Sequence, residues 1–238
     1  MMNFDPIFSI ARNDLVIITA TGEQDVFLWE HSSRVARSAQ LIAQLPVVQA
    51  HLPDEFAVVA AGLYHDASWA IQYREGEIER TEILRRPTSK AHRQRGVALM
   101  EQSLAELAPE ESLERAADTI RALNERDPEL VEAQVIADAE NLDEFGMLAF
   151  CPAILRSAHE GKGVQAAIDT WQRKKEYQFW TARLNESFRF DPVRELARKR
   201  LAQYERAMQD LDEHHRGADI PVAHSGQELA HPSPSRTR

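Results

Sequence analysis

The stretch AAGLYHDASWA, residues 60–70, places a histidine and an aspartate side by side in a run of small and apolar residues. Removing a lone charge from water is costly, so an ionisable pair in such a run needs a partner. A divalent metal suits a neutral imidazole beside a carboxylate. If His65 and Asp66 hold a metal, the chain should supply further ligands at the same depth, and His31 and Asp138 are the candidates.

The composition favours a mostly helical protein. The chain has 238 residues, of which 43% are hydrophobic and only 9 are glycine. Apolar residues recur at spacings of three and four, as they do on the buried face of a helix. The length fits one large domain, or a domain with an appendage. We therefore expect an all-α fold with a substantial core.

The net charge of −10 argues against binding to nucleic acid backbones or anionic membranes. It leaves room for a locally basic pocket that binds a small phosphorylated ligand. Cys151 is the only cysteine, so no intramolecular disulfide can form and a cytoplasmic setting is expected. The first residues lack the pattern of a signal peptide, and the apolar run that begins at Leu15 is too short to span a bilayer.

Helical periodicity turns the two distant candidate ligands towards the core. A helix predicted over about 25–45 carries His31 on its apolar face, and a helix over about 54–69 carries the doublet. The pair Asp127-Pro128 is typical of a helix start. The helix that follows it has Asp138 on its apolar side.

Elsewhere in the chain the hydrophobic pattern is less regular, and the expected structure differs from one segment to the next. LVIITAT, residues 15–21, is interpreted as the end of a first buried helix, because no second strand is evident to pair with it. Residues 72–89 are charged and predict a long excursion or lid. One helix is expected over 164–188 and another over 191–217. Residues 216–238 are polar, contain three prolines and are expected to be disordered.

The densest basic cluster of this acidic chain lies in and after the excursion. Its members are Arg85, Arg86, Lys90, Arg93 and Arg95. Such a cluster is commonly a solvated face. It would equally serve as a phosphate-binding patch, since arginine offers planar, bidentate donors to phosphate oxygens.

The order H…HD…D resembles that of the HD-domain superfamily of metal-dependent phosphohydrolases. The matching stretches are WEHSSRVARSAQLIA around His31, AAGLYHDA around the His65-Asp66 doublet, and VIADAENLDEFG around Asp138. The last stretch, together with LARKRLAQYERAM in the C-terminal half, is most similar to the small bacterial YedJ/YpgQ-like branch. The resemblance covers roughly residues 24–213.

This resemblance implies an HD-domain helical bundle with a helical C-terminal extension. The implied domain spans 1–215, with a metal-site core over about 24–150 and C-terminal helices over about 151–215. It also implies one divalent metal, for which manganese, magnesium, iron, nickel or zinc would be admissible. The implied ligands are His31, His65, Asp66 and Asp138.

Two departures from the family pattern affect the expected chemistry. Relatives that bind two metals carry further histidines between the doublet and the last aspartate; His92 could match one. Where the next would fall the sequence reads DTIRALNERDPE, with Asn124 as the nearest polar candidate, so a dinuclear site is not expected. Some mononuclear relatives carry a glutamate three residues after the doublet. Trp69 stands there, which leaves the general base unassigned.

A hydrolytic mechanism can nevertheless be stated as a hypothesis. A metal-bound water of lowered pKa would attack phosphorus, with Asp66 orienting that water through its second oxygen. The candidates for binding the phosphorylated substrate are Arg34, Lys90, His92 and Arg93. Arg34 could instead form a surface salt bridge with Glu30, and His92 could be an ordinary core or surface residue. Asp143 could support Asp138 or cap a helix end.

The function expected from the sequence is a cytoplasmic phosphohydrolase that acts on a small phosphorylated metabolite, with nucleotides as the first candidates. One alternative is an HD-type metalloenzyme with non-phosphate chemistry, such as hydration or oxidation. A second alternative, from a different class, is a non-catalytic helical ligand-binding module that keeps the metal without turnover.

Overall fold

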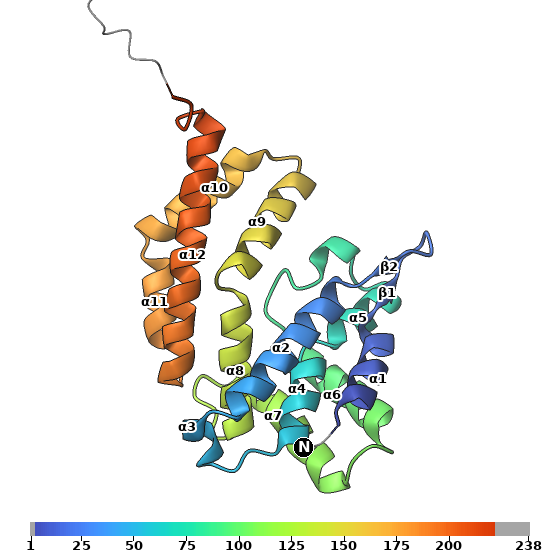
Figure 1. Ribbon diagram of the computed structural model, residues 1–238. Helices are drawn as coiled ribbons and strands as arrows, with labels where there is room; N and C mark the ends of the chain where they lie inside the picture. The colour runs from blue at the N-terminus through green and yellow to red at the C-terminus, as the bar shows by residue number, and fades with distance from the viewer. Residues whose placement is uncertain (1–2, 222–238) are drawn as a thin grey trace, which may run out of the picture.

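The computed structural model describes residues 3–221, and within them the fold is all-α, as the sequence predicted (Figure 1). One small hairpin accompanies the helices. In chain order the elements are α1 (Asp5–Leu15), β1 (Ile17–Ile18), β2 (Gln24–Asp25), α2 (Phe27–Ala43), α3 (Pro46–Gln49), α4 (Glu55–Tyr64), α5 (Ser68–Arg74), the 3₁₀ turn η1 (Arg80–Glu82), α6 (Lys90–Leu104), α7 (Glu110–Ala122), α8 (Val131–Asp143), α9 (Met147–His159), α10 (Val164–Glu176), α11 (Phe179–Glu186) and α12 (Asp191–Arg216).

Helix α4 forms the centre of the core. Its residues from Phe56 to Tyr64 are all buried, which explains why its sequence is apolar on every side. It packs against α2, α7 and α8. At Gly62 the backbones of α4 and α2 come so close that an added Cβ would lie 2.8 Å from the Cα of Ala36. This close crossing brings the end of α4 next to the middle of α2.

The histidine–aspartate doublet lies in a turn between two helices. The sequence predicted one helix over 54–69, but α4 ends at Tyr64 and α5 begins at Ser68. The backbone keeps right-handed helical dihedrals at His65 and Ala67, so a tightened turn joins the two helices and holds the doublet.

Two further predictions of single helices were wrong. LVIITAT is not the end of a helix: α1 stops at Leu15, and β1 pairs with β2 in an antiparallel register of Ile17 with Asp25. The expected helix over 164–188 is two helices, because Gln178 adopts a left-handed conformation with φ of 53° between α10 and α11. A two-residue strand is too short to show the alternation of apolar and polar residues by which a strand is recognised in a sequence.

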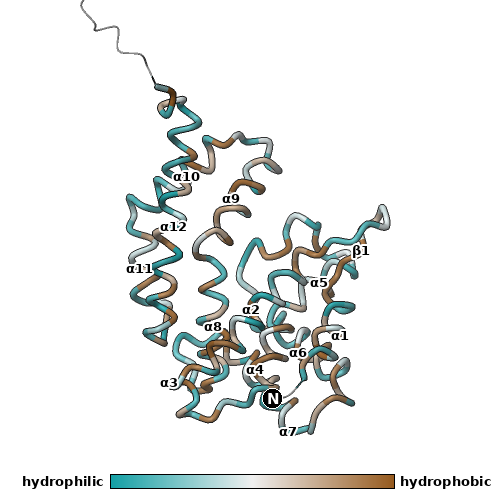
Figure 2. The backbone as a smooth tube through the Cα atoms, in the orientation of Figure 1, coloured by the Kyte–Doolittle hydropathy of each residue, from teal (hydrophilic) through white to brown (hydrophobic). Residues whose placement is uncertain are grey.

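The C-terminal helices α9 to α12 pack beside α8, on the far side from α1 (Figure 1). Helix α12 is largely hydrophilic in Figure 2, and its buried residues Val193, Ala197, Tyr204 and Met208 follow helical spacing. It ends at a left-handed Gly217, as predicted. The predicted disordered tail, 216–238, lies almost entirely outside the described residues, and the domain bounds 1–215 stay a prediction.

None of the helices within residues 3–221 combines the length and the apolar character needed to cross a membrane.

Candidate metal centre

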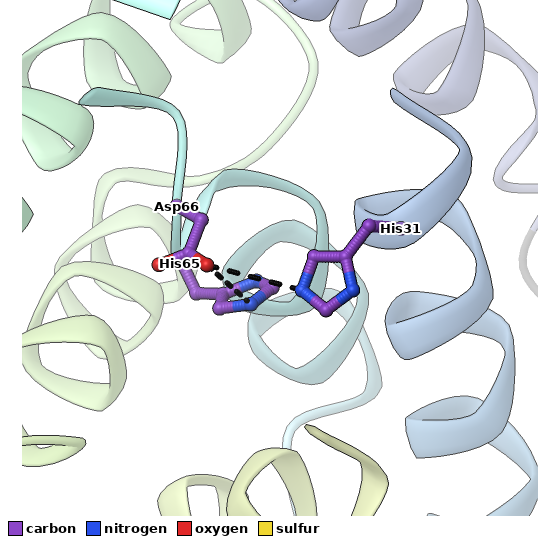
Figure 3. Close-up of side chains that lie close together, drawn as sticks. All are labelled: His31, His65 and Asp66. Carbon is purple, nitrogen blue, oxygen red and sulfur yellow. Dashed lines mark ion pairs between the residues drawn. The ribbon is translucent and has the colours of Figure 1, made fainter. Parts of the chain in front are cut away.

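Three metal-ligating side chains converge at the end of α4. His31 projects from α2 towards His65 and Asp66 in the turn after α4 (Figure 3). One potential ligand atom from each of the three lies within 4.8 Å of the others, and this is the one such group found within the described part of the chain. The structure therefore brings together three of the four ligands predicted from the sequence.

His65 presents one ring nitrogen to this cluster with no other partner. Its Nδ1 lies 2.9 Å from the carbonyl oxygen of Gly62, which can only accept a hydrogen bond, so Nδ1 carries the proton. Nε2 is then an acceptor that is fully buried, without a hydrogen-bond partner in the structure. A buried acceptor of this kind fits a metal ligand.

His31 is held in a matching orientation by a carboxylate on α8. Its Nδ1 donates to Oδ2 of Asp143 at 3.0 Å, and its Nε2 lies 3.8 Å from Oδ2 of Asp66. The guanidinium of Arg34 donates two hydrogen bonds, of 2.9 and 3.0 Å, to the same Asp143 carboxylate. A carboxylate behind a histidine is the common support of a metal ligand, because it fixes both the tautomer and the ring orientation.

The two oxygens of Asp66 have different surroundings. Oδ2 lies 3.5 Å from Nε2 of His65, within the cluster. Oδ1 accepts a hydrogen bond of 2.5 Å from the Thr88 hydroxyl and lies 3.9 Å from Nη1 of Arg93. The expectation that Asp66 keeps its second oxygen available to orient water is therefore not supported, because that oxygen is already engaged.

The local electrostatics favour a neutral His65 beside an ionised Asp66. Burial lowers the pKa of His65 below its usual value. Burial alone would raise the pKa of Asp66, but its neighbours, which include Arg93, His31 and the hydroxyl of Thr88, lower it overall. Burial also opposes the charge on His31, yet its hydrogen bond to Asp143 and the charge of Asp66 raise its pKa. Two imidazole nitrogens and one carboxylate oxygen form a donor set suited to a divalent transition metal.

Asp138, the fourth predicted ligand, lies elsewhere. Its Oδ1 accepts from the backbone N–H of Arg189 at 2.9 Å, and its Oδ2 accepts from the backbone N–H of Phe190 at 3.0 Å. Asp138 is fully buried, and it joins α8 to the start of α12. The structure does not bring it together with the other three, because it faces the C-terminal helices.

Glu140 is a carboxylate near the cluster that the sequence reasoning missed. It is half-buried on α8, three residues before Asp143, so the two share a face of the helix. Asp143 on this face hydrogen-bonds to His31, and the negative charge of Glu140 opposes the lowering of the His65 pKa by burial. The three-residue spacing of Glu140 and Asp143, which places both on one face of the helix, is the sequence feature that could have identified Glu140 as a candidate.

The four predicted substrate-binding residues are not equivalent. Arg34 binds Asp143 rather than Glu30, so its expected role on a phosphoryl group competes with a structural one. Arg93 is buried and donates from Nη1 to the carbonyl oxygen of His65 at 3.1 Å. Lys90 is exposed at the start of α6, and His92, two residues further, is half-buried.

The basic cluster divides into groups with different partners. Arg95 pairs with Glu75 and with Glu77, so its charge is neutralised within the excursion. The guanidinium of Arg86 lies over the ring of Trp69, 5.8 Å from its centroid. A single phosphate-binding patch made of the whole cluster is therefore not present, and Arg93 is the member that touches the doublet.

Comparison with known proteins agrees with this geometry. The HD domain model matches residues 28–144, which include His31, the doublet, Glu140 and Asp143. No curated protein matches the sequence.

Solved structures share the fold. Bacillus subtilis YpgQ is 22% identical, with a TM-score of 0.55 over 90% of this chain and 96% of its own. The same protein in complex with ADP gives a TM-score of 0.57 at 23% identity, over 91% and 96% of the two chains. A predicted HD superfamily hydrolase from an uncultured Thermotogales bacterium is 15% identical, with a TM-score of 0.50 over 89% and 91%. Residues 28–144 therefore match an HD domain, and the chain shares its fold with YpgQ and with a predicted HD superfamily hydrolase.

Proposed function

We propose that the protein is a metal-dependent phosphohydrolase that acts on a small phosphorylated metabolite, with nucleotides as the first candidates. The observation that carries this proposal is the convergence of three ligand atoms, one of which, Nε2 of His65, is buried without a partner. The shared fold with YpgQ, which binds ADP in one of its structures, favours a nucleotide over other phosphorylated metabolites.

We assign the metal to His31, His65 and Asp66, with Glu140 as the fourth ligand in place of Asp138. Glu140 lies on α8 one turn before Asp143, which hydrogen-bonds to His31, whereas both oxygens of Asp138 accept backbone hydrogen bonds. Manganese, magnesium, iron, nickel and zinc all remain compatible with two nitrogen and two oxygen donors. A divalent ion in this site would supply a bound water of lowered pKa and polarise a phosphoryl oxygen.

The remaining residues prepare the site for an anionic substrate. Asp143 holds His31, and Arg34 neutralises Asp143. Arg93 places a buried positive charge beside Asp66. Exposed Lys90 and half-buried His92, both at the start of α6, are proposed to contact the outer phosphate oxygens. In the reaction water would add to phosphorus while the P–O bond to the leaving group breaks, and the leaving oxygen takes up a proton.

The test is release of phosphate or pyrophosphate from a panel of nucleoside mono-, di- and triphosphates in the presence of Mn²⁺. We expect His65→Ala and Asp66→Ala to lose at least about 100-fold in rate, because each removes a proposed metal ligand. His51→Ala is the matched control, since His51 is exposed, lies between α3 and α4 and is not part of the cluster. It should retain the wild-type rate.

Other outcomes would favour the alternatives. Oxygen uptake with iron and no phosphate release would favour an HD-type oxygenase. Stoichiometric metal binding without turnover on broad substrate panels would favour a non-catalytic ligand-binding module and would contradict the proposal.

A further inference from the structure

Thr88 is a buried residue within an otherwise exposed part of the excursion. Residues 85–87 and Ser89 are exposed, whereas Thr88 is only 3% exposed. Its backbone carbonyl accepts a hydrogen bond of 3.0 Å from Nδ2 of Asn124. At Thr88 the excursion therefore reaches into the core beside the doublet.

The hydrogen bonds of the Thr88 hydroxyl have a fixed direction. The indole Nε1 of Trp69 lies 2.9 Å from the Thr88 Oγ1, and an indole nitrogen can only donate. The hydroxyl must therefore use its own hydrogen on its second neighbour, Oδ1 of Asp66, at 2.5 Å. The chain of donors runs from Trp69 through Thr88 to the carboxylate.

This arrangement decides which oxygen of Asp66 faces the two histidines. With Oδ1 held by Thr88, Oδ2 is left at 3.5 Å from Nε2 of His65 and 3.8 Å from Nε2 of His31. Arg93 alone would hold the carboxylate less well, because its Nη1 is 3.9 Å from Oδ1. Hydrogen bonds to the outer atoms of a ligand commonly tune its affinity for metal.

We propose that Thr88, oriented by Trp69, is a positioning residue that makes Asp66 bind the metal through Oδ2 alone. The inference rests on the proposed metal site but not on the proposed substrate. It also links the excursion around residues 75–89 to metal binding, since the same residue belongs to both.

The experiment compares Mn²⁺ affinity, and the visible absorption of bound Co²⁺, in metal-free protein and its variants. Thr88→Val keeps the shape of the side chain and removes the hydroxyl. We expect it to bind Mn²⁺ about 10- to 100-fold more weakly and to alter the Co²⁺ spectrum, which reports coordination geometry. Thr88→Ser restores the donor and should stay near the wild-type affinity and spectrum.

Thr119→Val is the matched control. Thr119 is also fully buried, and its hydroxyl donates at 2.8 Å to the carbonyl oxygen of Arg115, within α7. It should leave Mn²⁺ affinity unchanged even if it lowers stability. A merely structural role for Thr88 would make Thr88→Val behave like Thr119→Val.

The inference is overturned if Thr88→Val binds Mn²⁺ as wild type does, or if Thr88→Ser loses as much affinity as Thr88→Val. If Thr88→Val does not fold, Trp69→Phe replaces it, because it removes the donor that orients the hydroxyl. Weaker Mn²⁺ binding in Trp69→Phe supports the inference, and unchanged binding overturns it. If the wild-type protein binds Mn²⁺ but hydrolyses no nucleotide, weaker Mn²⁺ binding in Thr88→Val would leave this inference standing while the proposed function fails.

Discussion

Two acidic residues on α8, the buried Asp138 and the half-buried Asp143, have different roles although they lie close together in the sequence. Both carboxylate oxygens of Asp138 accept hydrogen bonds from the backbone N–H groups of Arg189 and Phe190. Both carboxylate oxygens of Asp143 accept hydrogen bonds from the side chains of His31 and Arg34. The first joins two parts of the fold, and the second orients a candidate metal ligand. Burial and charge alone do not distinguish these roles, because they depend on the donor that each carboxylate meets.

Among single residues, a comparison of Asp138→Asn with Glu140→Gln tests whether Glu140, in place of Asp138, is the fourth metal ligand. Asp138→Asn replaces one acceptor oxygen by a donor facing a backbone N–H. We expect it to lower the free energy of unfolding by about 1–3 kcal/mol. It should leave Mn²⁺ stoichiometry and affinity intact. Glu140→Gln should weaken Mn²⁺ binding while changing stability little, because its partly exposed side chain supplies charge to the site.

Metal titration and denaturant unfolding of the two variants measure both effects. The opposite pattern, with metal lost in Asp138→Asn and kept in Glu140→Gln, would restore the ligand set expected from the resemblance.

At the scale of the element, the crossing of α2 and α4 positions the site. His31 and the doublet come from segments more than thirty residues apart in sequence, and they meet because the two helices approach closely at Gly62. The turn between α4 and α5 then directs His65 and Asp66 towards α2. The spacing between helices therefore sets the distance between ligands.

Gly62→Ala should disturb this crossing. The added Cβ would stand 2.8 Å from the backbone Cα of Ala36, so α2 and α4 must separate. We expect a loss of about 1–3 kcal/mol in unfolding free energy, as for other overpacked cores. Mn²⁺ affinity should fall as well, because His31 moves with α2. Both quantities are read from denaturant curves and metal titration.

Gly163→Ala serves as the control, since nothing lies within 4 Å of an added Cβ there. Unchanged metal affinity in a destabilised Gly62→Ala would show that the crossing supports the fold without setting the ligand geometry.

At the scale of the whole molecule, α8 is buried on two sides and joins the metal site to the C-terminal helices. Glu140 and Asp143 face the site, whereas Asp138 and Asn141 bond to residues 187–190. An aromatic cluster continues the contact, with the ring of Phe145 centred 5.4 Å from those of Trp180 and Phe188. We expect the two parts to unfold together.

Metal binding should then stabilise the entire described fold. Mn²⁺ at about 100 times its dissociation constant should add about 2.7 kcal/mol to the unfolding free energy. Circular dichroism and tryptophan fluorescence should report the same shifted midpoint. His65→Ala should show no shift. Two separate transitions, of which only one responds to Mn²⁺, would mean that the C-terminal helices form an independent unit.

The sequence predicted the helical class and three of the clustered residues because those features are local. Hydrophobic periodicity identified α2 and placed His31 on its inner side. The adjacent pair His65-Asp66 stood out because charged groups are rare in so apolar a run. The last helix was bounded by its proline start and glycine end. The break after Tyr64, the short hairpin and the division at Gln178 were missed, because each depends on tertiary contacts or on a single backbone conformation.

The sequence by itself determined that the protein is a helical bundle with ionisable groups buried in its core. Only the tertiary structure decided which of those groups meet. Periodicity states that a side chain points inward, but α8 has two inward sides, and Asp138 faces the one away from His31 and the doublet. The hydrogen bond from Thr88 to Asp66 likewise joins residues 22 positions apart, which no local pattern records.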